Sequence, residues 1–87
     1  MEKGSKAKRQ NRVVIFTTPT CSWCRTAKQY FLQKRIPFKE IDVTRDSYGL
    51  KEMVRISGQQ GVPVILINNR PIVGFNKPQI ERLLNIN

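Results

Sequence analysis

The only two cysteines of this chain, Cys21 and Cys24, have two residues between them and follow a β-branched run at the start of a stretch with helical spacing. The run Val13–Phe16 has no polar alternation, which is typical of a strand buried on both faces. From Ser22 to about Lys34, apolar residues recur at intervals of three and four, which predicts a helix. The cysteine pair is therefore expected where a central strand passes into a helix.

The rest of the chain also alternates strand and helix. The pair Ile36-Pro37 is expected to end the first helix, because the residue before a proline is disfavoured in the α region. The later elements are expected as a strand over Phe38–Val43, a helix over Tyr48–Ile56 closed by Gly58, a strand over Pro63–Ile67, a hairpin turn at Asn68-Asn69, an edge strand over Pro71–Val73 and a helix over Lys77–Leu84. The order β-α-β-α-β-β-α predicts an α/β fold in which a four-stranded mixed sheet is flanked by three helices.

Length and charge limit the class of protein. A chain of 87 residues has room for one core, and its apolar runs are far shorter than the roughly 20 residues that cross a bilayer. The formal net charge is +10, and the first twelve residues hold five basic residues against one acidic residue. We expect residues 1–12 to form a basic disordered arm and 13–87 to form the folded domain. A solvated arm is favoured over a nucleic-acid contact, since no recognised nucleic-acid motif accompanies it.

The cysteine spacing suits a metal site, a structural staple or a redox centre. A zinc site needs four ligands, and two cysteines without any histidine cannot complete it within one chain. A disulfide across two residues closes a loop too short to restrict the unfolded chain much. A cysteine at a helix N-terminus, in contrast, meets free N–H groups and the positive end of the helix dipole, which favour a thiolate. The pair therefore indicates a redox centre.

The two cysteines are expected to have different roles. Cys21 would lie exposed at the strand-to-helix junction, whereas Cys24, one turn further, would be shielded by the helix. We expect Cys21 to attack a substrate disulfide and Cys24 to resolve the mixed disulfide, which leaves the pair oxidised. Such thiol chemistry, without an apolar signal core at the N-terminus, points to a soluble cytoplasmic protein.

Three segments in order, FTTPTCSWCRTAK, GVPVILI and VGF, resemble the glutaredoxin branch of the thioredoxin superfamily over about Arg12 to Asn87. The resemblance implies a thioredoxin-like three-layer fold and reduction of protein disulfides or glutathione mixed disulfides, with no bound cofactor. It also implies that Pro63 is cis and lies beside the nucleophile, and that the backbone of Val62 pairs with substrate as an added strand. The residues expected to bind substrate or glutathione are Trp23, Arg25, Lys28, Gln59, Val62, Pro63, Gly74, Phe75 and Asn76.

Several positions depart from the glutathione-using members of that family. Places that usually hold lysine, tyrosine, threonine and acidic residues are occupied by Thr18, Trp23, Gly61 and Asn76-Lys77. The segment GFNKPQIERLL is similar to glutaredoxin-like redoxins that serve ribonucleotide reductase and receive electrons from NADPH through thioredoxin reductase. Both thioredoxin reductase and glutathione stay open as electron source, because three side chains could still hold glutathione carboxylates: Arg25, Lys28 and Gln59.

The resemblance leaves further alternatives. Ser22 replaces the proline of the motif, as in glutaredoxins that hold a [2Fe-2S] cluster between two protomers with glutathione as co-ligand. The main expectation is instead a monomer without metal that reduces disulfide-containing proteins. Trp23 is expected either to stack on the bound peptide or glutathione or to shield the cysteines. Phe75 is expected either in the core or beside the substrate groove.

Overall fold

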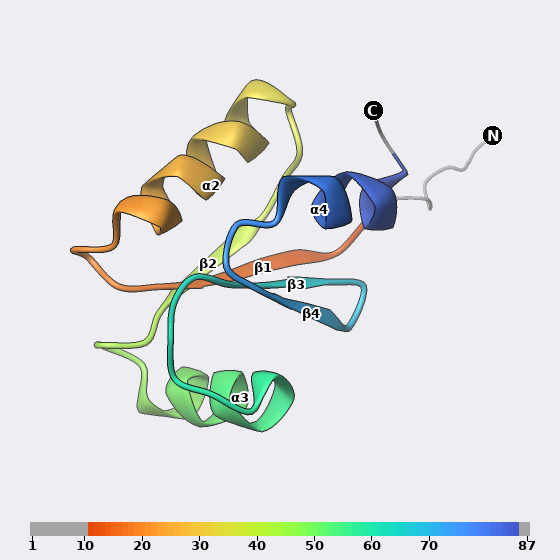
Figure 1. Ribbon diagram of the computed structural model, residues 1–87. Coiled ribbons are helices and arrows are strands. Elements are labelled where there is room, and N and C mark those ends of the chain that lie inside the picture. The colour runs from red at the N-terminus through yellow and green to blue at the C-terminus, as the bar shows by residue number, and fades with distance from the viewer. Residues whose placement is uncertain (1–10, 86–87) are drawn as a thin grey trace, which may run out of the picture.

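The computed structural model describes residues 11–85, which form one mixed sheet between two layers of helices (Figure 1). The elements are β1 (Val13–Thr17), α2 (Ser22–Gln33), β2 (Lys39–Asp42), α3 (Ser47–Ser57), β3 (Val64–Ile67), β4 (Arg70–Val73) and α4 (Lys77–Leu84). Their order is the β-α-β-α-β-β-α expected from the sequence.

The four strands lie in the order β2-β1-β3-β4. β1 pairs in parallel with β2, and Thr17 stands opposite Asp42, while β3 is antiparallel to both β1 and β4. The turn Asn68-Asn69 joins β3 to β4 with both residues at positive φ, 51° and 70°, as a tight hairpin turn requires. β1 is thus an inner strand, and its C-terminal end leads directly into the cysteine segment.

Alternate residues of β1 belong to two separate hydrophobic cores. Ile15 packs with the buried faces of α2 and α4, and Phe16 packs with the single helix α3 on the other side (Figure 1). Ala27, Phe31 and Ile80 of the first core and Met53 of the second have no exposed surface. The sheet therefore holds α2 and α4 side by side over one face.

The first helix ends close to Lys34, as its spacing predicts, and before Ile36-Pro37, which was expected to end it. Its last residue is Gln33, and Arg35 follows at φ 58°. The N–H of Ile36 then donates to the carbonyl of Phe31 at 2.9 Å, and that of Arg35 to Leu32 at 3.1 Å, which is a Schellman closure. The helix stops because its final carbonyls are capped by a left-handed residue, and the proline only prevents it from resuming.

The expected basic arm lies mostly outside the described residues, and its boundary stays a prediction. At the N-terminal end of the described residues, the side chain of Asn68 in the hairpin turn makes two hydrogen bonds. Its Nδ2 donates to Asn11 Oδ1 at 2.8 Å, and its Oδ1 accepts from the backbone N–H of Arg12 at 2.9 Å. These contacts fix the chain just before β1. Within residues 11–85, no helix has the length and apolar character to span a membrane.

Candidate active site

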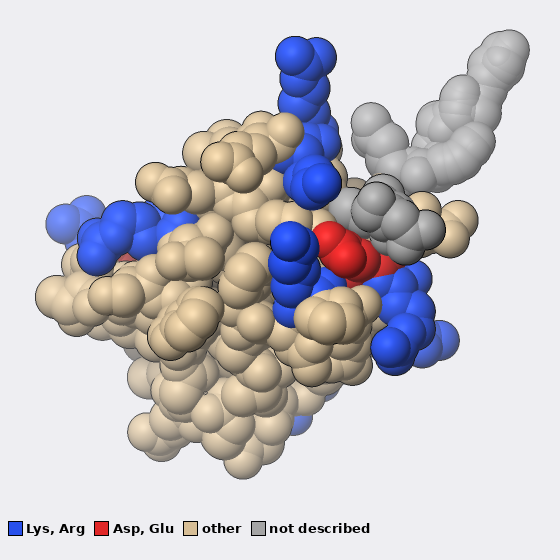
Figure 2. Space-filling model, turned by 45° about the horizontal axis from the view of Figure 1, so that its top comes forward, with Lys and Arg blue, Asp and Glu red and all other residues tan. Residues whose placement is uncertain are grey.

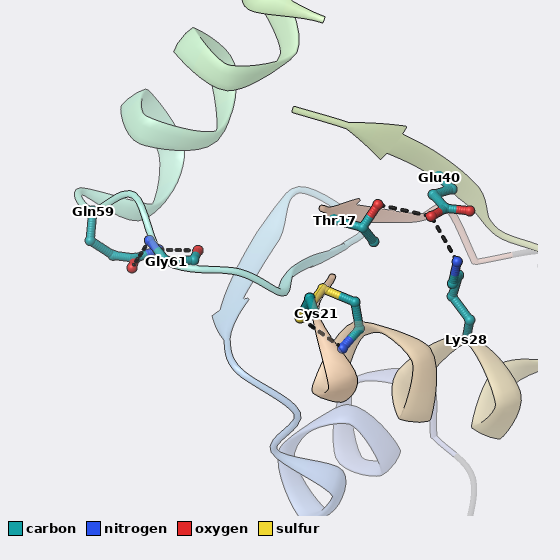
Figure 3. The surroundings of a disulfide bond; sticks show 7 residues. Thr17, Cys21, Lys28, Glu40, Gln59 and Gly61 are labelled. Atoms are coloured by element: carbon teal, nitrogen blue, oxygen red, sulfur yellow. Dashed lines mark hydrogen bonds and ion pairs between the residues drawn. A yellow bond between two sulfur atoms is a disulfide. The ribbon is translucent and has the colours of Figure 1, made fainter. Parts of the chain in front are cut away.

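The two cysteines lie at the N-terminus of α2 and are joined as a disulfide (Figure 3). Cys21 is the N-cap residue: its Sγ accepts a hydrogen bond from the N–H of Cys24 at 3.0 Å. Cys21 is partly exposed, whereas Cys24 is 1% exposed. Cys21 is therefore the more accessible of the two cysteines.

The helix N-terminus also sets the electrostatics of this end. The first turn of α2 contains no acidic residue, so the positive end of its dipole is not compensated by a neighbouring carboxylate. After reduction, the Cys24 N–H and the dipole favour the thiolate form of Cys21. The site is therefore suited to nucleophilic sulfur chemistry.

A small polar network joins β1, β2 and α2 beside the disulfide (Figure 3). The hydroxyl of Thr17, which is 1% exposed, donates to Glu40 Oε2 at 2.8 Å. Lys28 Nζ lies 2.9 Å from the same oxygen. This ammonium, together with the Thr17 hydroxyl, holds the pKa of Glu40 below its ordinary value. Lys28, expected near the thiolate or a glutathione carboxylate, is thus engaged with β2.

The segments around Pro63 and Gly74 meet at the ends of β3 and β4. The Val62–Pro63 peptide bond is cis, as the resemblance implied, and Pro63 is buried. Gly74 has φ 85°, and its N–H donates to the carbonyl of Pro63 at 2.8 Å. The chain that follows Gly61 runs toward the disulfide (Figure 3). These two segments therefore form one hydrogen-bonded unit beside the helix N-terminus.

The side chain of Gln59 is bound to its own loop (Figure 3). Its Oε1 accepts from the N–H of Gly61 at 2.6 Å, and its Nε2 donates to the carbonyl of Gly61 at 3.1 Å and to Ser57 Oγ at 3.2 Å. An ideal Cβ at Gly61 would lie 2.7 Å from Gln59 Oε1. The absence of a side chain at Gly61 thus makes room for this amide, which shapes the loop before the cis proline.

Aromatic side chains connect the cysteine turn with α4. Trp23 is 63% exposed, and its ring centroid lies 6.4 Å from that of Phe75, which in turn lies 5.6 Å from Tyr30. Phe75 is partly buried and packs against the α2–α4 core, the first of the two positions considered for it, while its place beside a substrate groove stays a prediction. Asn76 is the N-cap of α4 and accepts from the N–H of Gln79 at 3.3 Å.

The remaining expected contact, Arg25, is exposed on the solvent side of α2.

Sequence reasoning missed Thr17 and Glu40. A threonine that ends a buried β-branched run is a usable signal for a hydrogen bond at a strand end, but its partner follows only from the register of β2. Among residues 11–85, no three His, Cys, Asp or Glu side chains gather as a metal site would require.

Comparison with known proteins gives a family match. The glutaredoxin family model matches residues 13–72. A glutaredoxin-like 8.6 kDa protein from the rubredoxin operon of Clostridium pasteurianum, itself uncharacterized, is 44% identical over 72 residues, which cover 83% of this chain and 96% of that protein.

Solved structures agree with the fold. A mutant of the thioredoxin-like protein BC3987 superposes with a TM-score of 0.81 at 21% identity, over 86% of this chain and 96% of that one, which establishes the thioredoxin-like fold. The glutaredoxin-like NrdH-redoxin of Escherichia coli, described as having a thioredoxin-like activity profile, superposes with a TM-score of 0.72 at 28% identity. That match covers 83% of this chain and 93% of the other.

Proposed function

This chain belongs to the glutaredoxin family, and from that premise we propose that it is a dithiol–disulfide oxidoreductase that reduces protein disulfides or glutathione mixed disulfides. Cys21 is the nucleophile and Cys24 the resolving thiol. The observation that carries this assignment is their unequal exposure at the start of α2: Cys21 is partly open to solvent and Cys24 is closed off.

The proposed reaction moves two electrons from the protein dithiol to the substrate. The Cys21 thiolate attacks one sulfur of the substrate disulfide, and a Cys21–substrate disulfide forms while the other substrate sulfur leaves as a thiolate that takes up a proton. Cys24 then loses its proton and attacks Cys21 Sγ. The second substrate thiolate leaves and is protonated, and the Cys21–Cys24 disulfide seen here is the oxidised product.

Substrate binding would use the unit formed by the Val62–Pro63 and Gly74–Phe75 segments. The cis Val62–Pro63 peptide bond and the Gly74–Pro63 hydrogen bond support a fixed backbone edge here, along which an extended substrate could pair as an added strand. Trp23 and Phe75 would cover the substrate from the α2 side. Both rings lie close together and Trp23 is largely open to solvent.

The electron donor that we favour is thioredoxin reductase with NADPH rather than glutathione. Two side chains available for glutathione carboxylates are already engaged, Lys28 with Glu40 and Gln59 with Gly61. The likeness to NrdH-redoxin supports the same choice. A reducing compartment such as the cytoplasm fits a chain whose function depends on repeated reduction of its disulfide. Ribonucleotide reductase is one disulfide-containing partner to test.

A coupled NADPH assay tests this proposal. The oxidised protein is given either thioredoxin reductase or glutathione with glutathione reductase, and wild type is compared with Cys21→Ser and Cys24→Ser. Turnover with thioredoxin reductase that needs both cysteines supports the proposed donor. Turnover only with glutathione that survives Cys24→Ser makes glutathione the donor. Absence of turnover in both systems overturns the oxidoreductase assignment.

The alternative function, a glutathione-ligated [2Fe-2S] dimer, has its own signature. Each chain presents one partly exposed cysteine, so a four-ligand cluster would need two protomers and two glutathione thiolates. Such a protein would be a coloured dimer that loses its colour and dissociates when glutathione is removed. A colourless monomer after iron and sulfide reconstitution with glutathione excludes this function.

A further inference from the structure

Exposed basic residues occur over much of the folded part, and Lys39, Lys51 and Arg70 form no salt bridge within residues 11–85. Lys28, Arg45 and Arg55 have acidic partners. A second group has no such partner. We call it the α2–α4 surface, and it consists of the exposed basic residues of α2, of the turn after α2 and of α4: Arg25, Lys34, Arg35, Lys77 and Arg82. None of them forms a salt bridge with another residue among 11–85. In Figure 2 several Lys and Arg groups stand out from the surface, and acidic surface is visible between the groups right of centre.

Two lysines of this surface converge on one ring. Lys34 Nζ lies 5.8 Å and Lys77 Nζ 5.7 Å from the ring centroid of Tyr30, within the range of cation–π contact. Lys34 follows α2 and Lys77 begins α4, so two segments far apart in the sequence bring their ammonium groups to the same aromatic ring. The only acidic residue of the two helices, Glu81, is partly buried and accepts a hydrogen bond from the Tyr30 hydroxyl at 3.0 Å.

The helix dipoles add to this charge. Neither α2 nor α4 has an acidic residue in its first turn, and Lys77 occupies the first turn of α4 itself. A cation there is unfavourable for the helix, because the N-terminal dipole is already positive. An anionic group bound beside Lys77 would relieve that repulsion, which is a reason for a carboxylate to bind at this end of α4.

An aromatic path connects the lysine pair with the disulfide. It runs from Trp23, in the turn between the cysteines, through Phe75 to Tyr30, with centroid separations of 6.4 and 5.6 Å. An extended peptide advances about 3.3–3.6 Å per residue, so the span from Trp23 to Tyr30 corresponds to no more than about four residues. A peptide whose disulfide lies at Cys21 and which contacts Trp23 would thus approach the Tyr30 ring and its lysines within about four residues.

We propose that the α2–α4 surface binds an acidic segment of the protein substrate, placed within about four residues of the contact with Trp23. The inference rests on the proposed function, because it assumes that the partner brings a disulfide to Cys21. A peptide is favoured over a nucleic acid because Trp23, on the same helix as Arg25, is exposed at the redox site, where a disulfide-bearing partner has a reason to bind.

The test compares two synthetic disulfide peptides that differ only in four residues beyond the cysteine, Asp/Glu in one and Asn/Gln in the other. Their kcat/KM values are measured with wild type, with Lys34→Gln/Lys77→Gln, and with the matched double variant Lys39→Gln/Lys51→Gln. The matched variant removes the same charge, but from exposed lysines of β2 and α3, away from the α2–α4 surface.

Wild type should prefer the acidic peptide by about 3- to 10-fold at low salt, since two exposed ion pairs contribute modestly. The preference should shrink as salt screens the charges. Lys34→Gln/Lys77→Gln should bring the ratio of the two kcat/KM values close to one, and the matched variant should keep the wild-type ratio. Equal loss in both double variants would show a net-charge effect and overturn the proposal.

Two other outcomes would overturn it for different reasons. Equal rates on both peptides, with single-stranded oligonucleotide binding that Lys34→Gln/Lys77→Gln abolishes, would assign the surface to nucleic acid. Failure to reduce even the neutral peptide would overturn the proposed function itself, whereas turnover of both peptides without preference removes only the docking proposal.

Discussion

The backbone N–H of Gly74 donates a hydrogen bond of 2.8 Å to the carbonyl oxygen of Pro63. It joins the segment that carries the cis peptide bond to the segment that carries Phe75, so both edges of the proposed substrate groove are fixed to each other. Gly74 makes this contact at φ 85°, in the left-handed region that favours glycine.

Gly74→Ala should therefore lower both stability and substrate affinity. No atom lies within 4 Å of the added Cβ, so the cost comes from the backbone conformation alone, about 1–2 kcal/mol. The matched control is Gly58→Ala, which has φ 74°, equally open space, and a position at the end of α3. Urea unfolding should show similar losses in both variants, but only Gly74→Ala should raise the KM for a peptide disulfide. Equal KM values in Gly74→Ala and Gly58→Ala would show that Gly74 does not contribute to substrate binding.

The Gln59 amide and Gly61 should be energetically coupled. Gly61→Ala pushes a Cβ toward Gln59 Oε1 and displaces the amide from its bonds to the Gly61 backbone, which should cost about 1 kcal/mol. In a Gln59→Ala background the same change has no amide to displace. A double-mutant cycle on the free energy of unfolding should give a coupling of about 0.5–1 kcal/mol. Additive effects would mean that the amide does not hold the loop in solution.

Glu40 should make stability depend on pH in the acid range. The hydrogen bond from Lys28, aided by that from Thr17, lowers the pKa of Glu40 below its ordinary value of 4.5. The folded state therefore binds this proton less readily than the unfolded state, so its contribution is present above about pH 4.5 and is lost as pH falls through the folded pKa.

Unfolding of wild type and Glu40→Gln, followed between about pH 3 and pH 7, should show a difference that shrinks toward low pH. Thr17→Val should give a smaller difference of the same form, because it removes one of the two donors to Glu40 Oε2. A difference that stays constant over the whole range would contradict the network as the source of the pKa shift.

Tyr30 should make stability depend on pH in the alkaline range. Burial, followed by the hydrogen bond to Glu81, raises the pKa of Tyr30 from 10.0 to about 12. The folded state keeps the hydroxyl proton that the unfolded state loses above pH 10.0, so this stabilisation is complete below that value and disappears by about pH 12. The stability advantage of wild type over Tyr30→Phe should fall across this window. An unchanged advantage would mean that folding does not raise the pKa of Tyr30.

Much of the fold follows from local sequence patterns. The uninterrupted run Val13–Phe16 predicts an inner strand, and the spacing after Ser22 predicts α2. Each pattern marks side chains that are buried in the fold, on β1 and on the inner side of α2. The spacing also places the end of α2 close to Lys34, but it does not show the cause of that end, since nothing in the residue type of Arg35 signals a left-handed cap. In the absence of a glycine, proline was the only visible stop signal, and it lies beyond the true end.

The site was predictable only where its chemistry is local. Cys21 caps α2 and Cys24 lies in its first turn, so their unequal exposure follows from helical geometry. The Thr17–Glu40 bond and the convergence of Lys34 and Lys77 on Tyr30 depend on strand register and on how α4 lies beside α2. Such relations join residues far apart in the sequence, and no local pattern encodes them.

The central claim, that Cys21 is the nucleophile and Cys24 resolves, is tested most directly by trapping the mixed disulfide. Reduced Cys24→Ser and Cys21→Ser proteins are each incubated with a peptide disulfide, quenched with acid and weighed intact. We predict that Cys24→Ser accumulates one peptide adduct, mapped to Cys21, while Cys21→Ser remains unmodified because its remaining thiol is buried. An adduct on Cys24 in the Cys21→Ser protein, formed as fast as that on Cys21, would contradict the assignment.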